Sequence, residues 1–156
     1  MEPPMQTIAS LEELRAAVGA PAAVSGYFTL DQRIIDTFAD LTHDRQWIHV
    51  DPVRAAAESP YGCTIAHGLL TLSMVTAAFG QCYRFPNRKL SLNYGFDRVR
   101  FTGAVPAGSR LRGSFALQRV EDVRPGEVRC FWQVELQVEG ADRPAMVATW
   151  LMQMRY

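Results

Sequence analysis

The spacing of apolar residues changes along the chain, and its first half has the spacing of helices. Ile34, Ile35, Phe38 and Leu41 fall on one face of a helix that ends near residue 42. Capping-box patterns at residues 10–13 and 29–32 predict two helix starts, the first for a short helix that ends near residue 18. The second opens the amphipathic helix. We expect a short strand over residues 24–29 and a further short helix over residues 52–58.

The segment from Gly68 to Phe79 has a different character, because its apolar residues lie all round a helical wheel. A helix that is apolar on every side is buried on every side. Its few hydroxyl side chains can donate to carbonyls one turn back. The pattern therefore predicts a central helix within the core.

From about residue 90 the apolar period becomes two. Four runs alternate apolar with polar residues, at 99–101, 111–117, 128–138 and 146–154, and three connectors carry Gly or Pro turn signals, at 106–108, 125–126 and 140–142. Such regular alternation is typical of antiparallel strands with one wet face. Helices followed by a strand meander predict an α+β protein with its sheet wrapped around the central helix, the hot-dog arrangement. An open wrapped sheet leaves an edge or a helix flank uncovered, so we expect a homodimer or a higher homo-oligomer.

Length and charge narrow the class further. The chain has 156 residues, and 16 acidic side chains balance 16 basic ones, of which only Lys89 is lysine. These values favour one folded domain over residues 1–156 and argue against disorder and against nucleic acid as a partner. The longest near-apolar stretch, residues 68–80, is shorter than a membrane span. With no secretory signal and three scattered cysteines, Cys63, Cys82 and Cys130, we expect a cytoplasmic protein that does not contact a membrane.

Candidate chemistry lies in the polar segment between the second and third predicted helices. Asp44 and His49 are five residues apart, so they would not share a helix face, but they can converge if the segment is irregular. A carboxylate beside an imidazole can act as an acid–base pair on one water. From spacing alone, a capping role for Asp44 and a surface or packed role for His49 stay open.

A second candidate is Gly68, at the start of the central helix. Its N–H has no partner within the helix, and it could bind the oxygen of a thioester carbonyl as that oxygen gains negative charge. Tight packing against the sheet is the alternative reason for a glycine there. A metal bound by His43, Asp44, His49 and His67 is disfavoured, because there is no HExxH motif and no cysteine at zinc spacing. Cys63 is better explained as a small buried filler than as a nucleophile.

Three blocks of sequence, residues 44–55, 65–73 and 93–109, resemble the MaoC-like dehydratases. They read Asp44-Arg45-Gln46-Trp47-Ile48-His49-Val50-Asp51-Pro52 with Arg54-Ala55, Ile65-Ala66-His67-Gly68-Leu69-Leu70-Thr71-Leu72-Ser73, and Asn93-Tyr94-Gly95 with Val99-Arg100-Phe101, Val105-Pro106 and Gly108-Ser109. The likeness runs from about residue 10 to the end. It is strongest for the branch that contains nodulation protein N and (R)-specific enoyl-CoA hydratases.

The resemblance implies a dimeric hot-dog fold and reversible hydration of trans-2-enoyl-CoA to (3R)-3-hydroxyacyl-CoA, with the acyl-CoA thioester as substrate and no cofactor or metal. It places the catalytic pair on Asp44 and His49 and the oxyanion-binding glycine on Gly68. Gln46 would position the pair or the substrate. The family's helix serine would correspond to Thr76, or to Ser73 in a different register.

Other functions remain open on the sequence. A hot-dog thioesterase usually carries its carboxylate on or near the central helix, and residues 68–79 contain none. A dehydratase for carrier-protein-bound acyl chains and a non-enzymatic acyl-binding protein are further alternatives. Some of four arginines are expected to meet the CoA phosphates, namely Arg98, Arg100, Arg110 and Arg112.

Overall fold

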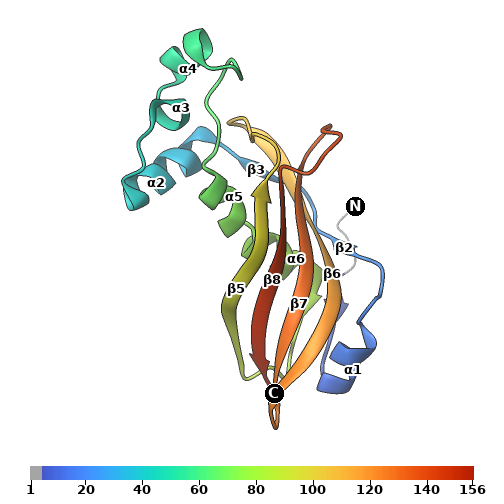
Figure 1. Cartoon of the computed structure of the whole chain (residues 1–156). Coiled ribbons are helices and arrows are strands. Elements are labelled where there is room, and N and C mark those ends of the chain that lie inside the picture. Colours follow the sequence, from blue (N-terminus) through green and yellow to red (C-terminus); the bar gives the residue numbers. More distant parts are fainter. Residues whose placement is uncertain (1–4) are drawn as a thin grey trace.

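Four long antiparallel strands form the body of the computed structural model, which describes residues 5–156 (Figure 1). They are β5 (Leu90–Phe101), β6 (Ser109–Arg124), β7 (Glu127–Val138) and β8 (Met146–Arg155). The short strand β2 (Ala23–Val24) completes the order β2–β6–β7–β8–β5, and β3 (Phe28–Leu30) also pairs with β6. The alternating pattern of the second half therefore predicted the sheet correctly, and the α+β hot-dog architecture is confirmed.

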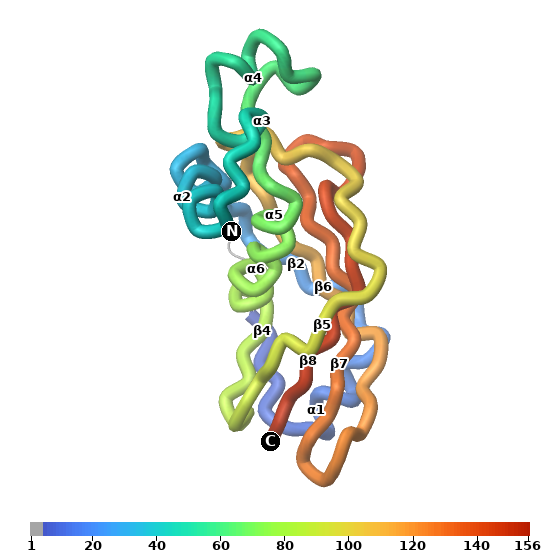
Figure 2. Tube along the Cα trace, turned by 60° about the vertical axis from the view of Figure 1, so that its left-hand side comes forward, coloured from blue at the N-terminus to red at the C-terminus, as the bar shows by residue number. Residues whose placement is uncertain are grey.

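The central helix lies against the sheet as two segments, α5 (Gly68–Ser73) and α6 (Val75–Cys82), and the sheet curves around it (Figure 2). The prediction of one uninterrupted helix was wrong, because the helix breaks at Met74. Two hydroxyls donate one turn back just before the break, from Thr71 to the His67 carbonyl at 3.2 Å and from Ser73 to the Leu69 carbonyl at 2.8 Å. Such back-bonding bends helices.

The central helix is also less buried than its sequence predicted. Leu69 is 63% exposed, and Ser73, Thr76 and Ala77 on α5 and α6 are exposed as well. The sheet of one chain covers only the opposite side of the helix. An apolar helix surface is therefore left open within a single copy.

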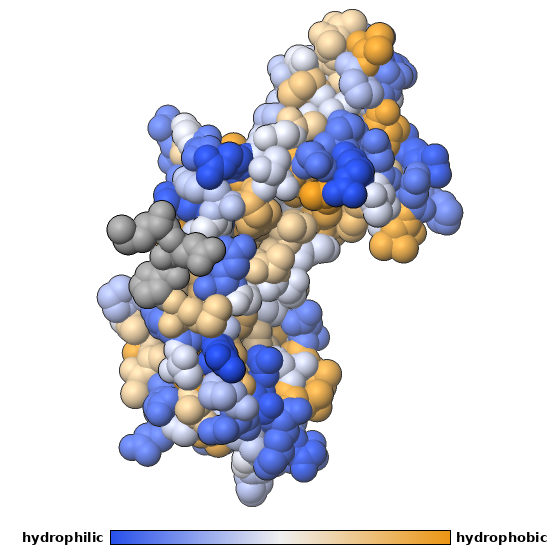
Figure 3. All heavy atoms as spheres, turned by 180° about the vertical axis from the view of Figure 1, so that it is seen from behind, coloured by the Kyte–Doolittle hydropathy of each residue, from blue (hydrophilic) through white to orange (hydrophobic). Residues whose placement is uncertain are grey.

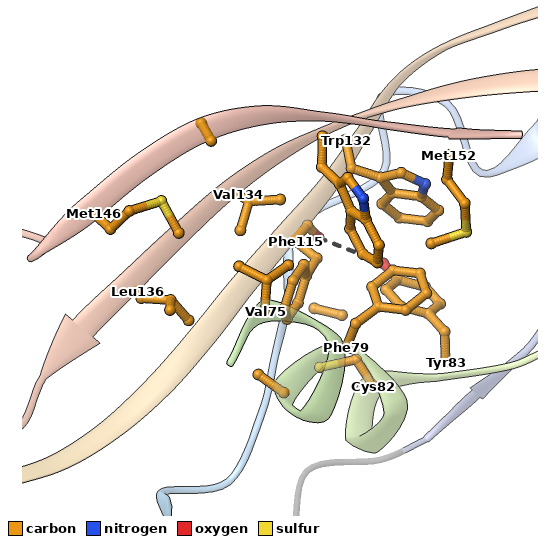
Figure 4. Close-up of a cluster of buried hydrophobic side chains, with 14 of the residues drawn as sticks. Val75, Phe79, Cys82, Tyr83, Phe115, Trp132, Val134, Leu136, Met146 and Met152 are labelled. Carbon is orange, nitrogen blue, oxygen red and sulfur yellow. Dashed lines mark hydrogen bonds between the residues drawn. The ribbon is translucent and has the colours of Figure 1, made fainter. Parts of the chain in front are cut away.

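Phe79 of α6 is the centre of the core (Figure 4). Its ring makes edge-to-face contacts with Phe115, Trp132 and Trp150, with centroids 5.0–5.2 Å apart. This geometry places the positive edge of one ring against the negative face of another. The contacts join α6 to β6, β7 and β8 at once.

Gly113 lets the helix approach the sheet closely. A Cβ atom built at Gly113 would lie 2.8 Å from the Ala78 Cβ and 2.8 Å from the Phe115 ring. No side chain fits there, so this glycine in β6 sets the distance between α6 and the sheet. Gly113 also exchanges two hydrogen bonds with Ser25, the residue that follows β2. The Ser25 N–H donates to the Gly113 carbonyl, and the Gly113 N–H donates to Ser25 Oγ, both at 2.8 Å.

The N-terminal elements agree only partly with the capping patterns. The short helix α1 (Leu11–Ala16) has Ser10 as its N-cap, as predicted. The second capping box was wrong, because Thr29 lies in β3 and Asp31 caps the next helix by accepting from the Ile34 N–H at 2.9 Å. The predicted strand over residues 24–29 is two short pieces, β2 and β3, while β1 (Gln6–Thr7) pairs in parallel with β4 (Tyr83–Arg84).

Three helices project beyond one end of the sheet. They are α2 (Gln32–Thr42), α3 (Trp47–Val50) and α4 (Pro52–Glu58). Seen from behind, apolar side chains gather in the angle between this projection and the body (Figure 3). Over residues 5–156, every helix is too short or too polar to cross a bilayer.

Replacing Phe79 with alanine tests the core. Truncation removes a buried aromatic ring at the contact of one helix with three strands, so we expect the free energy of unfolding to fall by about 3–5 kcal/mol. The control is Val53→Ala on α4, where the side chain is 83% exposed and the change should stay within about 0.5 kcal/mol. Urea unfolding followed by tryptophan fluorescence measures both, and equal losses would contradict this account of the core.

Candidate active site

The polar segment that links α2 to α4 carries the predicted acid–base pair. His43 ends α2 in the left-handed conformation, with φ 60°, and so turns the chain before Asp44. Gln46 then caps the short helix α3, where its carbonyl accepts from the His49 N–H at 2.9 Å. The two predicted catalytic residues therefore lie on a loop and on the helical turn that follows it, as the spacing required.

His49 is buried, with 6% of its surface exposed, and it is held by backbone groups. Its ring Nδ1 lies 2.7 Å from the Ile65 carbonyl, while the Ile65 N–H donates to the Ile48 carbonyl at 3.0 Å. A carbonyl oxygen only accepts, so Nδ1 carries the hydrogen in this bond. In the neutral ring the lone pair is therefore on Nε2, which is free to accept a proton.

Asp44, His49 and His67 converge. A carboxylate oxygen of Asp44 and one ring nitrogen of each histidine lie within 4.8 Å of one another, with Asp44 exposed and both histidines buried. The two imidazole rings stack with centroids 3.8 Å apart and an interplanar angle of 26°. The structure thus brings together the two predicted residues and a third one.

Burial is the main cause of a lowered pKa at His49, because it disfavours the charged imidazolium. The hydrogen bond to the Ile65 carbonyl opposes this shift, His67 adds to it, and the negative charge of Asp44 opposes it. His49 is therefore neutral at pH 7 and has the protonation state that a base needs.

A pocket of about 360 Å³ opens beside His49 and Gly68. Its wall includes Thr71 and Phe101, and it continues along residues 102–105. Gly68 is the first residue of α5, so its N–H has no acceptor within the helix. A Cβ atom built there would lie 2.9 Å from the Phe101 ring, so glycine keeps this wall of the pocket open.

The other predicted site residues lie elsewhere. The structure does not bring Ser73 and Thr76 to the pocket, since both are on the exposed side of the helix and Thr76 lines a separate pocket of about 400 Å³. Gln46 is exposed and contributes a carbonyl to α3. The hydroxyl of the central helix that lines the pocket is that of Thr71, which donates to the His67 carbonyl.

Sequence reasoning missed Thr71 and gave His67 no role beyond a disfavoured metal ligand. The available signal was position: His67 directly precedes Gly68 and is the N-cap residue of α5, so it lies next to the residue that the sequence placed at the helix start. Thr71 follows one turn later on the same side of the helix.

One ring nitrogen of each histidine in the converging group is engaged by the backbone. His49 Nδ1 and His67 Nε2 both lie at hydrogen-bond distance from backbone carbonyls, those of Ile65 and Asp44. His43, the fourth residue of the candidate metal set, is outside the converging group.

The four arginines do not form one patch. Arg110 and Arg112 are on β6, where Arg110 pairs with both carboxylate oxygens of Glu139 and Arg112 donates to Gln137. Arg98 and Arg100 are on β5, the edge strand at the other end of the strand order. This strand ends at Phe101, which is part of the pocket wall. None of the four arginines lines the pocket itself.

A sheet wrapped around a helix, with an aspartate and two histidines close together near the start of that helix, defines a hot-dog protein with a candidate acid–base site. The family model described as "MaoC like domain" matches residues 13–137. Nodulation protein N of Rhizobium meliloti is 43% identical over 91% of this chain and 89% of its own length. A 3-hydroxyacyl-thioester dehydratase Z of Mycobacterium tuberculosis is 44% identical over 92% of this chain and 95% of its own length.

Among solved structures, a MaoC-like dehydratase from Rhodospirillum rubrum superposes with a TM-score of 0.74 at 20% identity, over 93% of this chain and 95% of that one. The chain belongs to the MaoC-like dehydratase family. By class it is a hydro-lyase, an enzyme that adds water to a double bond or removes it.

The protonation of His49 is directly measurable, because the chain has only three histidines. We expect its NMR titration midpoint below 6.5, and a still lower midpoint in Asp44→Asn, which removes a charge that favours the imidazolium. The unfolded chain binds this proton more readily, so the stability that His49 contributes is present above pH 6.5 and is lost as pH falls below it. A midpoint at or above 6.5 in the wild type would contradict the burial argument.

Proposed function

We propose that this chain catalyses the reversible hydration of trans-2-enoyl-CoA to (3R)-3-hydroxyacyl-CoA. The observation that carries the proposal is the buried His49, which lines a pocket together with Gly68, lies close to Asp44 and has its Nδ1 engaged by the Ile65 carbonyl. The 44% identity to a protein named as a 3-hydroxyacyl-thioester dehydratase supports the substrate class. The stereochemistry and the CoA group come from the family resemblance.

In the hydration direction, the Gly68 N–H binds the thioester oxygen and draws electrons away from C3. A water held between Asp44 and His49 adds its oxygen to C3 while His49 Nε2 takes one of its protons. The electron pair of the double bond moves to the thioester, whose oxygen gains the charge that Gly68 stabilises. A proton then adds to C2, and the imidazolium holds the proton that this step requires.

Asp44 has the complementary role in this scheme. Its carboxylate accepts from the attacking water and stabilises the imidazolium that forms at His49, which agrees with its raising effect on the pKa of that ring. The reaction is redox-neutral, and the thioester itself activates the double bond. We therefore propose that the enzyme uses neither a cofactor nor a metal.

A hot-dog thioesterase fits the chain less well. Hydrolysis of a thioester needs a nucleophile or a base close to the carbonyl carbon. Residues 68–82, which form the helix beside the pocket, contain neither aspartate nor glutamate. The base of this site, His49, instead faces the pocket from a separate element.

Substituting the pair tests the reaction. In Asp44→Asn and in His49→Asn we expect crotonyl-CoA hydration to slow by about 10²- to 10⁴-fold, because each removes one member of the acid–base pair. Loss of the enoyl-thioester absorbance measures the rate. Thermal unfolding of each variant checks that the fold is intact.

Two matched controls make the same changes of residue type, His to Asn and Asp to Asn, at positions outside the proposed pair. His43→Asn replaces the neighbouring histidine at a left-handed position that asparagine tolerates, and Asp142→Asn removes an exposed carboxylate in the β7–β8 connection. Both controls should keep wild-type rates. Full activity in either site variant, or release of free CoA thiol in place of hydration, would overturn the proposal. Faster turnover of acyl chains bound to a carrier protein would show that the carrier protein, and not CoA, is the substrate group.

We also propose a homodimer. Strand β5 is an edge of the described sheet, and Leu90, Leu92 and Tyr94 on it are each about half exposed, as is Leu69 on the open side of α5. Together they leave an apolar edge and helix flank that a second copy would cover.

Light scattering after gel filtration tests the assembly. We expect twice the chain mass of 17.5 kDa for the wild type and a shift toward the single mass in Leu92→Arg, which places a charge on the edge strand. Val123→Arg, at an exposed apolar position near the β6–β7 turn, is the matched control and should not change the mass. A wild-type protein that runs at 17.5 kDa would refute the dimer.

A further inference from the structure

His67 lies where three parts of the proposed site meet. It is 3% exposed, it caps α5 directly before Gly68, and its ring contacts both the segment with Asp44 and the ring of His49. The hydration scheme above gives it no task. A buried histidine with polar and ring contacts to both catalytic residues therefore needs an explanation.

The polar contact of His67 reaches the backbone at Asp44. His67 Nε2 lies 2.9 Å from the Asp44 carbonyl oxygen, which can only accept, so Nε2 donates the hydrogen. Nδ1 of the same ring is buried without a partner. The Asp44 N–H has only a long contact of 3.4 Å, to Thr42 Oγ1, so His67 provides the buried attachment of this exposed loop.

The ring contact of His67 reaches His49. The His67 ring packs against two other rings. Its centroid is 5.1 Å from that of Phe38 on α2, at an interplanar angle of 53°, and 3.8 Å from that of His49, at 26°. Together with the hydrogen bond from His49 Nδ1 to Ile65, this packing fixes the plane in which Nε2 presents its lone pair.

We propose that His67 is a positioning residue for the hydration reaction. Its side chain links the Asp44 loop, the His49 ring and the start of α5 into one unit. The inference rests on the proposed function for its kinetic consequence. Its structural consequence, the attachment of the Asp44 loop, is independent of the reaction. A small misplacement of the reacting groups slows the reaction strongly, even where no reacting atom is removed.

Two substitutions separate the N–H of His67 from its ring. His67→Phe keeps a flat ring in contact with Phe38 and His49 but loses the donor to Asp44. His67→Gln loses the ring but retains an N–H at the reach of Nε2. We expect kcat for crotonyl-CoA hydration to fall on the order of 100-fold in His67→Phe, and to stay within about tenfold of the wild type in His67→Gln. KM should change by less than about threefold in both, since His67 does not line the pocket.

Hydrogen–deuterium exchange provides the second measurement. Amides of residues 43–46 should exchange faster in His67→Phe than in the wild type, with partial recovery in His67→Gln. Ser25→Ala is the matched control, because it also removes a buried hydrogen bond, the one that Ser25 Oγ accepts from the Gly113 N–H of β6. Ser25 is remote from residues 43–46 in sequence. This variant should lower Tm and leave both kcat and the exchange of residues 43–46 unchanged.

The outcomes are distinct. Wild-type kcat and unchanged exchange in His67→Phe would overturn the positioning role. So would an equal loss of kcat in His67→Phe and in Ser25→Ala when the two variants lose the same amount of Tm. A wild-type protein without hydratase activity, but with faster exchange in His67→Phe, would refute the proposed function and retain the attachment of the loop. Should His67→Phe not fold, His67→Met fills a similar volume without an N–H and carries the same expectations.

Discussion

The close approach of α6 to the sheet at Gly113 is the constraint on which the rest of the structure depends. There is no room for a Cβ atom between Ala78 and the Phe115 ring, so this glycine fixes how deep the helix lies. Phe79, one residue further along, then meets aromatic rings from three strands. A dense core of interlocking rings permits one position of the helix, because any shift would open voids or cause overlaps.

The place of the candidate active site follows from that position of the helix. Because α6 continues back through Met74 into α5, the start of α5 has a fixed place at one end of the sheet. The preceding segment is bonded to the sheet side, with the Ala66 N–H on the Val105 carbonyl, and to α3, with the Ile65 N–H on the Ile48 carbonyl. Backbone hydrogen bonds thus carry the geometry of the core outward to His49, which lies on the single helical turn α3.

Regular patterns were the most predictable part of the protein. Alternation identified β6, β7 and β8 over most of their length and the last residues of β5, and Ser10 identified the start of α1, since both depend on local sequence. Thr29 was misread as a cap because β3 pairing with β6 satisfies its backbone, which is a long-range effect. Burial of the central helix was overestimated for a similar reason: composition reports which residues are apolar, whereas the sheet of one chain reaches only one side of the helix.

Asp44 and His49 could be selected from the sequence as residue types at a spacing that suits acid–base chemistry, and the family resemblance strengthened that choice. Tertiary structure alone decided that Nδ1 of His49 is occupied by Ile65, that Thr71 and not Ser73 or Thr76 faces the pocket, and that His67 joins the pair. These contacts link positions 16 to 23 residues apart through carbonyl oxygens, which every residue has. Local sequence therefore determined the chemistry available to this protein, and packing of distant segments determined which atoms are oriented to use it.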